Sequence, residues 1–199
     1  MGKRRLEAAM NDTSPNLNFD VRWRPFQLNP SLPTGEGYNK LQYYKDRFGA
    51  QRVEGMIASM KEVGEEHGIS FSYGGSVGNS FNSHRLIWKA REEGGSELQD
   101  IMVNEIFHSY FEEEKSLGVN TVLEDCARKA GMDSSIISQV LSNESLGKDE
   151  VEREMIEFGR KWNCRGVPLF IVDGKYPLSG AQPPSMFLEV FDEIVSSTR

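Results

Sequence analysis

The order of apolar and polar residues predicts a short strand near the start of the chain, a long helical block and a C-terminal hairpin. Residues 17–24 alternate apolar and polar side chains, which is typical of a strand with one buried face. Residues 25–37 contain three prolines and two glycines and therefore predict a loop. From about residue 39 to residue 162, apolar residues return at steps of three and four, which is the helical period.

Local signals within this block indicate where individual helices begin and end. Residues 68–78 are rich in glycine and serine and predict a break. Residues 121–124, Thr-Val-Leu-Glu, fit the spacing of a capping box, in which two side chains bond the first free amides of a helix. That helix would end near Gly131, and either Asp133 or Ser134 would cap the next one.

The C-terminal part of the chain changes to a strand pattern. Residues 168–172 form a short continuous apolar run, which favours a buried strand. The Asp-Gly pair at 173–174 is a strong signal for a hairpin turn, so residues 176–179 would return as a second strand. Either Pro183 or Pro184 would start a final helix, because proline is favoured at the first helical position.

Strand patterns on both sides of the helical block predict an α/β domain that carries a helical insertion. The α/β domain would comprise residues 1–37 and 164–199, and the insertion residues 38–163. The sequence contains no repeats and no low-complexity linker that would separate the block. We therefore interpret the block as an insertion rather than as an independent domain.

Composition and charge narrow the classes of function. The chain has 199 residues and a formal net charge of −7, which argues against a broad nucleic-acid interface because such a surface must be basic. No apolar run approaches the length of a membrane span. Residues 1–10 are basic, but no apolar segment follows them as it would in a secretory signal. We therefore expect a cytoplasmic protein that binds neither nucleic acid nor membrane.

The two cysteines do not form a recognisable motif. Cys126 and Cys164 lie far apart in the sequence and form neither a Cys-x-x-Cys pair nor a zinc pattern. We interpret both as small buried apolar residues. A disulfide between them is the alternative, which a reducing compartment disfavours. We predict no metal site and no resident cofactor.

Four stretches of the sequence carry a resemblance to a known family. They are residues 2–7, 21–26, 79–86, and 166–170 together with 178–183. On these residues the chain resembles the DsbA-like branch of the thioredoxin superfamily, and within it the FrnE-type proteins, which are related to kappa-class glutathione transferases and 2-hydroxychromene-2-carboxylate isomerases. The stretches resemble, in order, the helix after Cys-Pro-Trp-Cys, the second strand, an insertion motif at the active-site cleft, and the cis-proline loop with its hairpin exit.

The resemblance implies a thioredoxin-like α/β fold with a large all-helical insertion, whose first strand and redox-active Cys-x-x-Cys are absent from this chain. The first residues agree with this, because Lys3, Arg4 and Arg5 would crowd the positive end of a helix that began here without a capping residue. We expect a truncated or catalytically impaired form. A shortened gene model, a splice form and true divergence remain open.

The resemblance also implies candidate site residues. Val167 and Pro168 would be joined by a cis bond, and the Val167 backbone would pair with an incoming peptide or glutathione. Asn79, His84 and Arg85 would line the cleft, and Gln182 would follow the hairpin where relatives bind glutathione. The pattern by itself favours a trans proline at the start of a strand, an ordinary helical histidine and a glutamine that only helps to start the last helix.

Three functions remain after these inferences. The first is membership of the thiol–disulfide oxidoreductases, with a thiol or disulfide substrate. The second is a non-catalytic module that binds a peptide or glutathione, and the third is a relative of glutathione-dependent isomerases or transferases. We name no catalytic residue and leave enzyme status open, because a dithiol that cycles by exchange is missing from the sequence. We expect the chain by itself to be unstable and inactive.

Overall fold

A computed structural model describes residues 1–13 and 17–197, and the chain divides into two compact units. Unit 1 comprises Met1–Asp20 and Ile156–Arg199, and unit 2 comprises Val21–Met155. The domain boundaries expected from the sequence, at 37/38 and 163/164, stay a prediction. Residues 21–37 lie in unit 2 because their hydrogen bonds are made there, such as Gly35 N to the Gly118 carbonyl at 2.8 Å.

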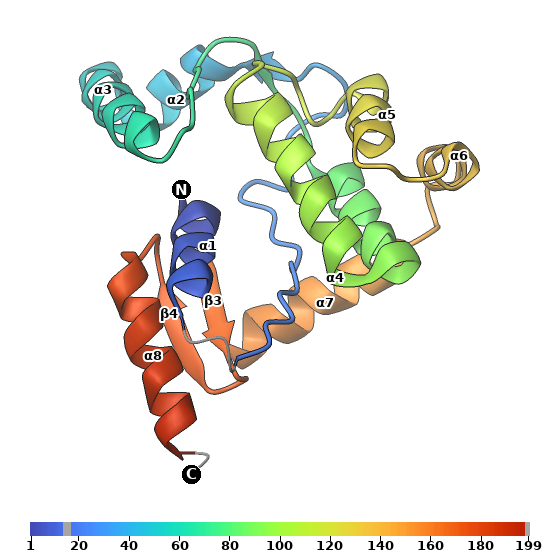
Figure 1. Cartoon of the computed structure of the whole chain (residues 1–199). Helices are drawn as coiled ribbons and strands as arrows, with labels where there is room; N and C mark the ends of the chain where they lie inside the picture. Colours follow the sequence, from blue (N-terminus) through green and yellow to red (C-terminus); the bar gives the residue numbers. More distant parts are fainter. Residues whose placement is uncertain (14–16, 198–199) are drawn as a thin grey trace. The chain divides into compact units, whose positions relative to one another are not determined.

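Unit 1 consists of a β-hairpin and two long helices, with the end of a third. Helix α1 (Gly2–Asp12) and helix α8 (Pro184–Ser197) lie beside strands β3 (Leu169–Val172) and β4 (Tyr176–Ser179), as Figure 1 shows. Helix α7 (Lys148–Lys161) begins in unit 2 and ends in unit 1. Apolar residues of α1, α8 and both strands share one core around Ala9, Phe187 and Phe191.

The predicted hairpin is confirmed. Strands β3 and β4 are antiparallel, with Leu169 opposite Ser179 and Val172 opposite Tyr176. Asp173 and Gly174 both have positive φ angles, 49° and 64°, which is the conformation of the tight turn that an Asp-Gly pair favours. Pro184 begins α8.

The strand predicted at 17–24 is wrong. The described residues of this segment, including those resembling a second strand, run as irregular chain and pair with no described strand. Two of its apolar side chains nevertheless pack within unit 1. Leu17 packs on the unit 1 core, and the Phe19 ring lies 4.9 Å from that of Phe191. Alternation indicates which side chains are buried, but a strand also requires a neighbour that accepts and donates its backbone hydrogen bonds.

Unit 2 is mainly helical. Its elements are β1 (Tyr38–Asn39), α2 (Lys40–Phe48), α3 (Ala50–Glu66), β2 (Ser76–Val77), α4 (Phe81–Phe111), α5 (Asn120–Lys129) and α6 (Ser134–Ser142). The short strands β1 and β2 form an antiparallel pair that brackets α2 and α3. The helical block predicted from the sequence is confirmed, and its glycine-rich break ends in β2.

Helix α4 reverses direction near its middle. Gly94 and Gly95 have non-helical backbone angles, and Gly95 has φ 65° and ψ −153°, a conformation that only glycine adopts readily. Beyond the reversal, Gln99 Nε2 donates to the Ile87 carbonyl at 3.3 Å, although the two residues are twelve positions apart. The two halves of α4 therefore lie side by side (Figure 1).

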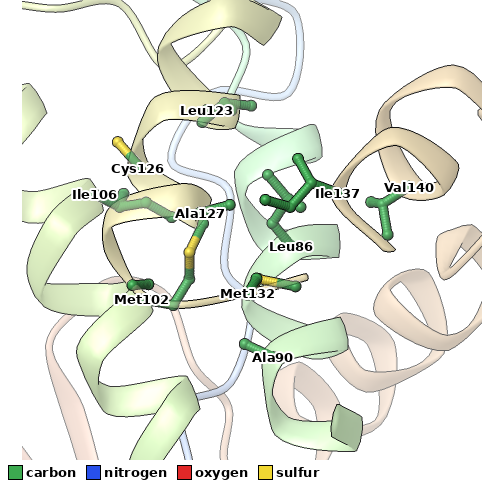
Figure 2. Packing of buried hydrophobic residues seen from close by; sticks show 11 residues of the cluster. Leu86, Ala90, Met102, Ile106, Leu123, Cys126, Ala127, Met132, Ile137 and Val140 are labelled. Atoms are coloured by element: carbon green, nitrogen blue, oxygen red, sulfur yellow. The ribbon is translucent and has the colours of Figure 1, made fainter. Parts of the chain in front are cut away.

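The core of unit 2 lies where the halves of α4 meet α5 and α6. Figure 2 shows Leu86 and Ala90 from the first half of α4 opposite Met102 and Ile106 from the second. Side chains from α5 and α6 complete the buried cluster, including Leu123, Cys126, Ala127, Ile137 and Val140. The periodic apolar residues of the sequence thus produce a layered helical core.

The two predicted helix starts have different outcomes. Asp133 caps α6, because its carboxylate accepts a hydrogen bond from the Ser135 amide at 2.8 Å. The capping box at 121–124 is wrong, since α5 starts at Asn120 after Val119 without a capping side chain. The Val119 carbonyl accepts from the amides of residues 122 and 123, which sets the helix start ahead of Thr121.

Candidate functional site

The Val167–Pro168 peptide bond is cis, as the resemblance predicted. It lies between the end of α7 and the start of β3. The Pro168 carbonyl accepts a hydrogen bond from the Gly180 amide at 2.9 Å, which ties the loop to the exit of the hairpin. The Val167 side chain is half exposed to solvent, at 50%. A ligand can therefore reach this turn.

The first turn of α1 lies against the same loop. A Cβ atom on Gly2 would be 3.1 Å from Pro168 Cγ and 3.1 Å from Phe170 Cζ, so the absence of a side chain at Gly2 allows this close approach. The Arg5 guanidinium donates to the Ala181 carbonyl, just beyond the hairpin. Unpaired amides at a helix N-terminus favour negative charge nearby. Unit 1 therefore places an anion-stabilising helix end next to Pro168.

Gln182 lies at the edge of this loop cluster. Its side-chain amide donates to the Ser179 carbonyl at 2.5 Å, and its backbone amide donates to the Gly180 carbonyl at 2.9 Å. These contacts hold the chain between β4 and α8. Gln182 therefore shares unit 1 with Val167 and Pro168, while its side-chain donor has a local partner.

Asn79 anchors a loop of unit 2. Its side-chain oxygen accepts from Gln27 Nε2 at 3.0 Å and from the Phe81 amide at 2.9 Å. Its side-chain nitrogen donates to the carbonyls of Pro30 and Leu32, at 2.9 and 3.0 Å. Asn79 thus fixes the proline-rich loop predicted at 25–37.

His84 has a neutral imidazole in unit 2. Burial lowers its pKa to about 4, and the hydrogen bond to the Phe26 carbonyl opposes this only in part. The ring borders a cavity of about 10 Å³, which it shares with Trp23 and Glu154. A space of that size holds about one water molecule, so it is too small for glutathione.

Arg85 is buried and joins the first half of α4 to α6 and to the turn that follows α6. Its guanidinium donates to the Val140 carbonyl at 2.7 Å and to the Asn143 carbonyl, and its Nε donates to the Leu146 carbonyl at 2.8 Å. A fourth bond reaches Asn82 Oδ1 at 2.9 Å. The carbonyls of Val140 and Asn143 lie at the end of α6, where a helix leaves its last carbonyls unpaired, and that of Leu146 lies in the turn beyond it. The described contacts of Arg85 are therefore those of a helix cap.

Comparison with known proteins identifies the family. Residues 1–192 match the DSBA-like thioredoxin domain. The chain belongs to this family. Among solved structures, a probable DsbA oxidoreductase from Streptomyces coelicolor matches with a TM-score of 0.88 and 24% sequence identity, over 96% of this chain and 82% of that one. At this identity the match shows the fold, a thioredoxin-like α/β fold with a helical insertion. The search of curated proteins gives no match.

The two cysteines of the DsbA-like chain lie in different units, and neither is in a disulfide. Cys126 is buried in the unit 2 core, where its thiol donates to Ser109 Oγ at 3.2 Å and burial raises its pKa. The interpretation as a small buried residue is confirmed for Cys126. It is wrong for Cys164, which is half-buried and donates to the Gly166 carbonyl at 3.3 Å.

Within residues 1–13 and 17–197, no group of three or more His, Cys, Asp or Glu side chains is arranged to hold a metal ion. Over the same ranges, none of the helices of the DsbA-like chain combines the length and the apolar character needed to cross a bilayer.

Lys40 is a buried cation that the sequence pattern did not single out. The Lys40 side chain is buried, with Nζ 2.7 Å from the Tyr110 carbonyl and 4.0 Å from the centre of the Tyr110 ring. Burial lowers its pKa to about 8, and the nearby Glu114 carboxylate acts in the opposite direction. A signal was present, since a lysine at the first position of a helix opposes the helix dipole.

Proposed function

We propose that the chain is the substrate-binding part of a thiol–disulfide oxidoreductase, in which peptide or glutathione binds at Val167 and Pro168. The single observation that carries the proposal is the approach of the first turn of α1 to Pro168, within 3.1 Å of a Cβ on Gly2. An exposed turn and a helix N-terminus thus lie together in unit 1. The first can hold an extended thiol compound, and the second can stabilise a thiolate.

The chemistry follows from these two parts. A thiolate attacks one sulfur of a disulfide, forms a mixed disulfide and releases the other sulfur as a thiolate. A cysteine at the N-terminal end of α1 would have its pKa lowered by the helix amides and dipole. Thiol–disulfide exchange by a dithiol would therefore require a Cys-x-x-Cys joined to this end of α1, because the 199 residues contain none.

Substrate binding would use the backbone of Val167. An extended peptide, or the peptide-like chain of glutathione, would add one rung of hydrogen bonds beside β3. Glutathione is here a substrate or ligand, and no resident cofactor is proposed. We keep the FrnE-type branch as part of this proposal, since residues 166–170 and 178–183 carry its motifs.

Titration with reduced glutathione tests the binding step. The amide signals of residues 166–169 are expected to shift, and those of α5 and α6 to remain unchanged, in two-dimensional NMR spectra. The matched control is S-methylglutathione, which keeps the peptide chain and should shift the same amides. Shifts confined to unit 2, with residues 166–169 silent, would contradict binding at the cis-proline loop.

Insulin reduction tests the redox step. The chain extended at its N-terminus by a strand and Cys-Pro-Trp-Cys should reduce insulin, and the same extension with Ala-Pro-Trp-Ala should not. The unextended chain should be inactive. If the extended dithiol chain binds glutathione but fails to reduce insulin, the non-catalytic module is the better function. If the unextended chain reduces insulin and Cys164→Ser abolishes this, Cys164 is the nucleophile and the proposal is wrong.

A further inference from the structure

The two outer edges of the unit 1 hairpin offer different backbone groups. Strands β3 and β4 pair with each other, and neither pairs with another strand within residues 1–13 and 17–197. Each strand therefore has one outer edge, where backbone N–H and C=O groups face away from the hairpin. Such an edge is a template for pairing with another chain, and proteins commonly protect it.

The register of the hairpin shows which residues face outward. The Gly180 amide donates to the Pro168 carbonyl at 2.9 Å, so these two residues bond across the pair of strands. In an antiparallel pair, residues that bond across alternate with residues whose N–H and C=O point outward. The outward pairs are therefore Leu169 with Ser179 and Ile171 with Pro177.

The outer edge of β4 lacks one donor and has one acceptor occupied. Pro177 has no N–H, and because its nitrogen faces outward, the proline removes no hydrogen bond from the hairpin. The Ser179 carbonyl accepts from Gln182 Nε2 at 2.5 Å, which agrees with an outward direction for this carbonyl. At these two positions, only the Pro177 carbonyl and the Ser179 N–H have no described partner.

The outer edge of β3 keeps its full set of groups. Leu169 and Ile171 each have an N–H and a C=O at this edge, and no hydrogen bond to these groups is made by the described residues. Neither position is a proline, and no side chain described here occupies a carbonyl. The features that reduce pairing are therefore particular to β4 and not shared by the whole hairpin.

The two features of β4 affect the same hydrogen bond. If the β4 edges of two copies met around a two-fold axis, the strands would run antiparallel. The register that uses both outward residues places position 177 of one copy opposite position 179 of the other. The missing N–H of Pro177 and the Ser179 carbonyl occupied by Gln182 would be the two ends of one bond, which would occur twice in the dimer.

We propose that Pro177 and Gln182 together close the outer edge of β4 against pairing with a second copy of the chain. Proline removes the donor, and the glutamine side chain occupies the acceptor. This inference does not depend on the proposed function, because no group of the Val167–Pro168 turn takes part.

Sedimentation equilibrium of the whole chain tests the proposal. Pro177→Thr/Gln182→Ala supplies the N–H and frees the carbonyl without adding a large apolar side chain. It should raise the self-association constant by at least about tenfold over the unchanged chain, as expected for two added backbone hydrogen bonds. Each single substitution should raise the constant by less than about threefold, because it restores only one end of the bond.

The matched control is Pro183→Thr/Gln182→Ala. Pro183 is also exposed, but it lies beyond β4, so its replacement supplies an N–H outside the edge. This variant should associate no more strongly than Gln182→Ala. Amide exchange read by NMR locates the contact: the Ser179 amide should become protected as Pro177→Thr/Gln182→Ala associates, whereas contact through β3 would protect Leu169 and Ile171.

The amides of Phe170 and Leu178, which bond inside the hairpin, show whether each variant keeps its fold. If Pro177→Thr/Gln182→Ala loses their protection, Pro177→Ala/Gln182→Ala supplies the same N–H and takes its place. The proposal is wrong if the folded double variant associates no more than the Pro183 control, or leaves the Ser179 amide unprotected. Protection of the Ser179 amide with rising concentration of the unchanged chain would equally overturn it, because the β4 edge would then be open.

Discussion

The core of unit 1 has three buried apolar residues, Ala9, Phe187 and Phe191, whereas the main cluster of unit 2 has eleven among the described residues. Unit 2 also buries polar side chains that have partners, such as Arg85 and Lys40. Apolar burial contributes most of the stability of a fold, while each buried polar group fixes one arrangement of its partners. We therefore expect the unit that carries the cis-proline loop to be less stable than the insertion.

Phe187→Ala should have the largest effect and should separate the two units. Phe187 is fully buried, and its ring packs edge-on against Phe170 with centroids 5.0 Å apart. Such a truncation typically costs about 3–5 kcal/mol. Hydrogen exchange followed by mass spectrometry should show loss of protection in β3 and α8, with α4 and α5 unchanged. Phe19→Ala, at a more exposed partner of the same core, is the milder control. Equal loss in α4 would mean that the units unfold together.

Arg85→Met tests whether buried polar contacts stabilise unit 2. The substitution keeps the apolar stem but leaves the carbonyls of Val140, Asn143 and Leu146 without the guanidinium. We expect a loss of about 3 kcal/mol in urea denaturation, because each unsatisfied buried group costs roughly 1–3 kcal/mol. Arg128→Met is the control. Arg128 forms exposed ion pairs on α5, which contribute about 0–1 kcal/mol. Similar losses of stability in Arg85→Met and Arg128→Met would argue against Arg85 as a cap of α6.

Lys40 should make the stability of unit 2 depend on pH. Its pKa is about 8 in the folded chain and 10.5 when unfolded, so below pH 8 both states are protonated and the folded state carries the burial penalty. Between pH 8 and 10 the folded state loses the Lys40 proton first, which should contribute a rise of roughly 2–3 kcal/mol to the free energy of unfolding. The Cys126 thiol, whose pKa burial raises from 9.0, should offset part of this rise above pH 9.

Lys40→Met should abolish this rise, as measured by urea denaturation at fixed ionic strength. The rise should end near pH 10, because burial raises the pKa values of Tyr73 and Tyr110. Above that pH these tyrosines ionise first in the unfolded chain, which lowers the free energy of unfolding. If the free energy of unfolding of Lys40→Met rises by the same amount, a titrating group other than Lys40 causes the rise.

Asp133→Ala should have the smallest effect of this series. Loss of the cap on α6 should destabilise unit 2 by about 1 kcal/mol. Thr121→Ala is the control, since Thr121 lies inside the first turn of α5 and caps nothing. It should change stability by less than about 0.5 kcal/mol. Thermal melts of both variants measure the two losses of stability. A larger loss of stability for Thr121→Ala than for Asp133→Ala would support a capping box at residues 121–124.

Local chemistry explains which parts of the fold were predictable. The Asp-Gly turn and the Asp133 cap depend on neighbouring backbone groups, and both are confirmed. The strand at 17–24 depends on a partner strand, which alternation cannot reveal. The reversal of α4 at Gly94 and Gly95 depends on contacts between its two halves, such as Gln99 with Ile87, which local chemistry does not supply.

The candidate site was predictable only where the family resemblance supplied the geometry. The cis bond at Val167–Pro168 was predicted from that resemblance, whereas the residue pattern by itself favoured a trans proline. The role of Arg85 was not predictable, because its partners are backbone carbonyls 55 to 61 residues away and carry no residue-specific signal.

The discontinuity of unit 1 has a consequence for synthesis on the ribosome. Residues 1–20 emerge before residues 21–155, but the contacts in their core involve Phe187 and Phe191, which emerge after all of those residues. At about 5–20 residues per second, this delay is on the order of ten seconds. Unit 2 draws its core from one continuous stretch and can fold during that interval. The N-terminal segment must therefore wait with its apolar side chains uncovered, and it is the part of the nascent chain where a chaperone would be needed.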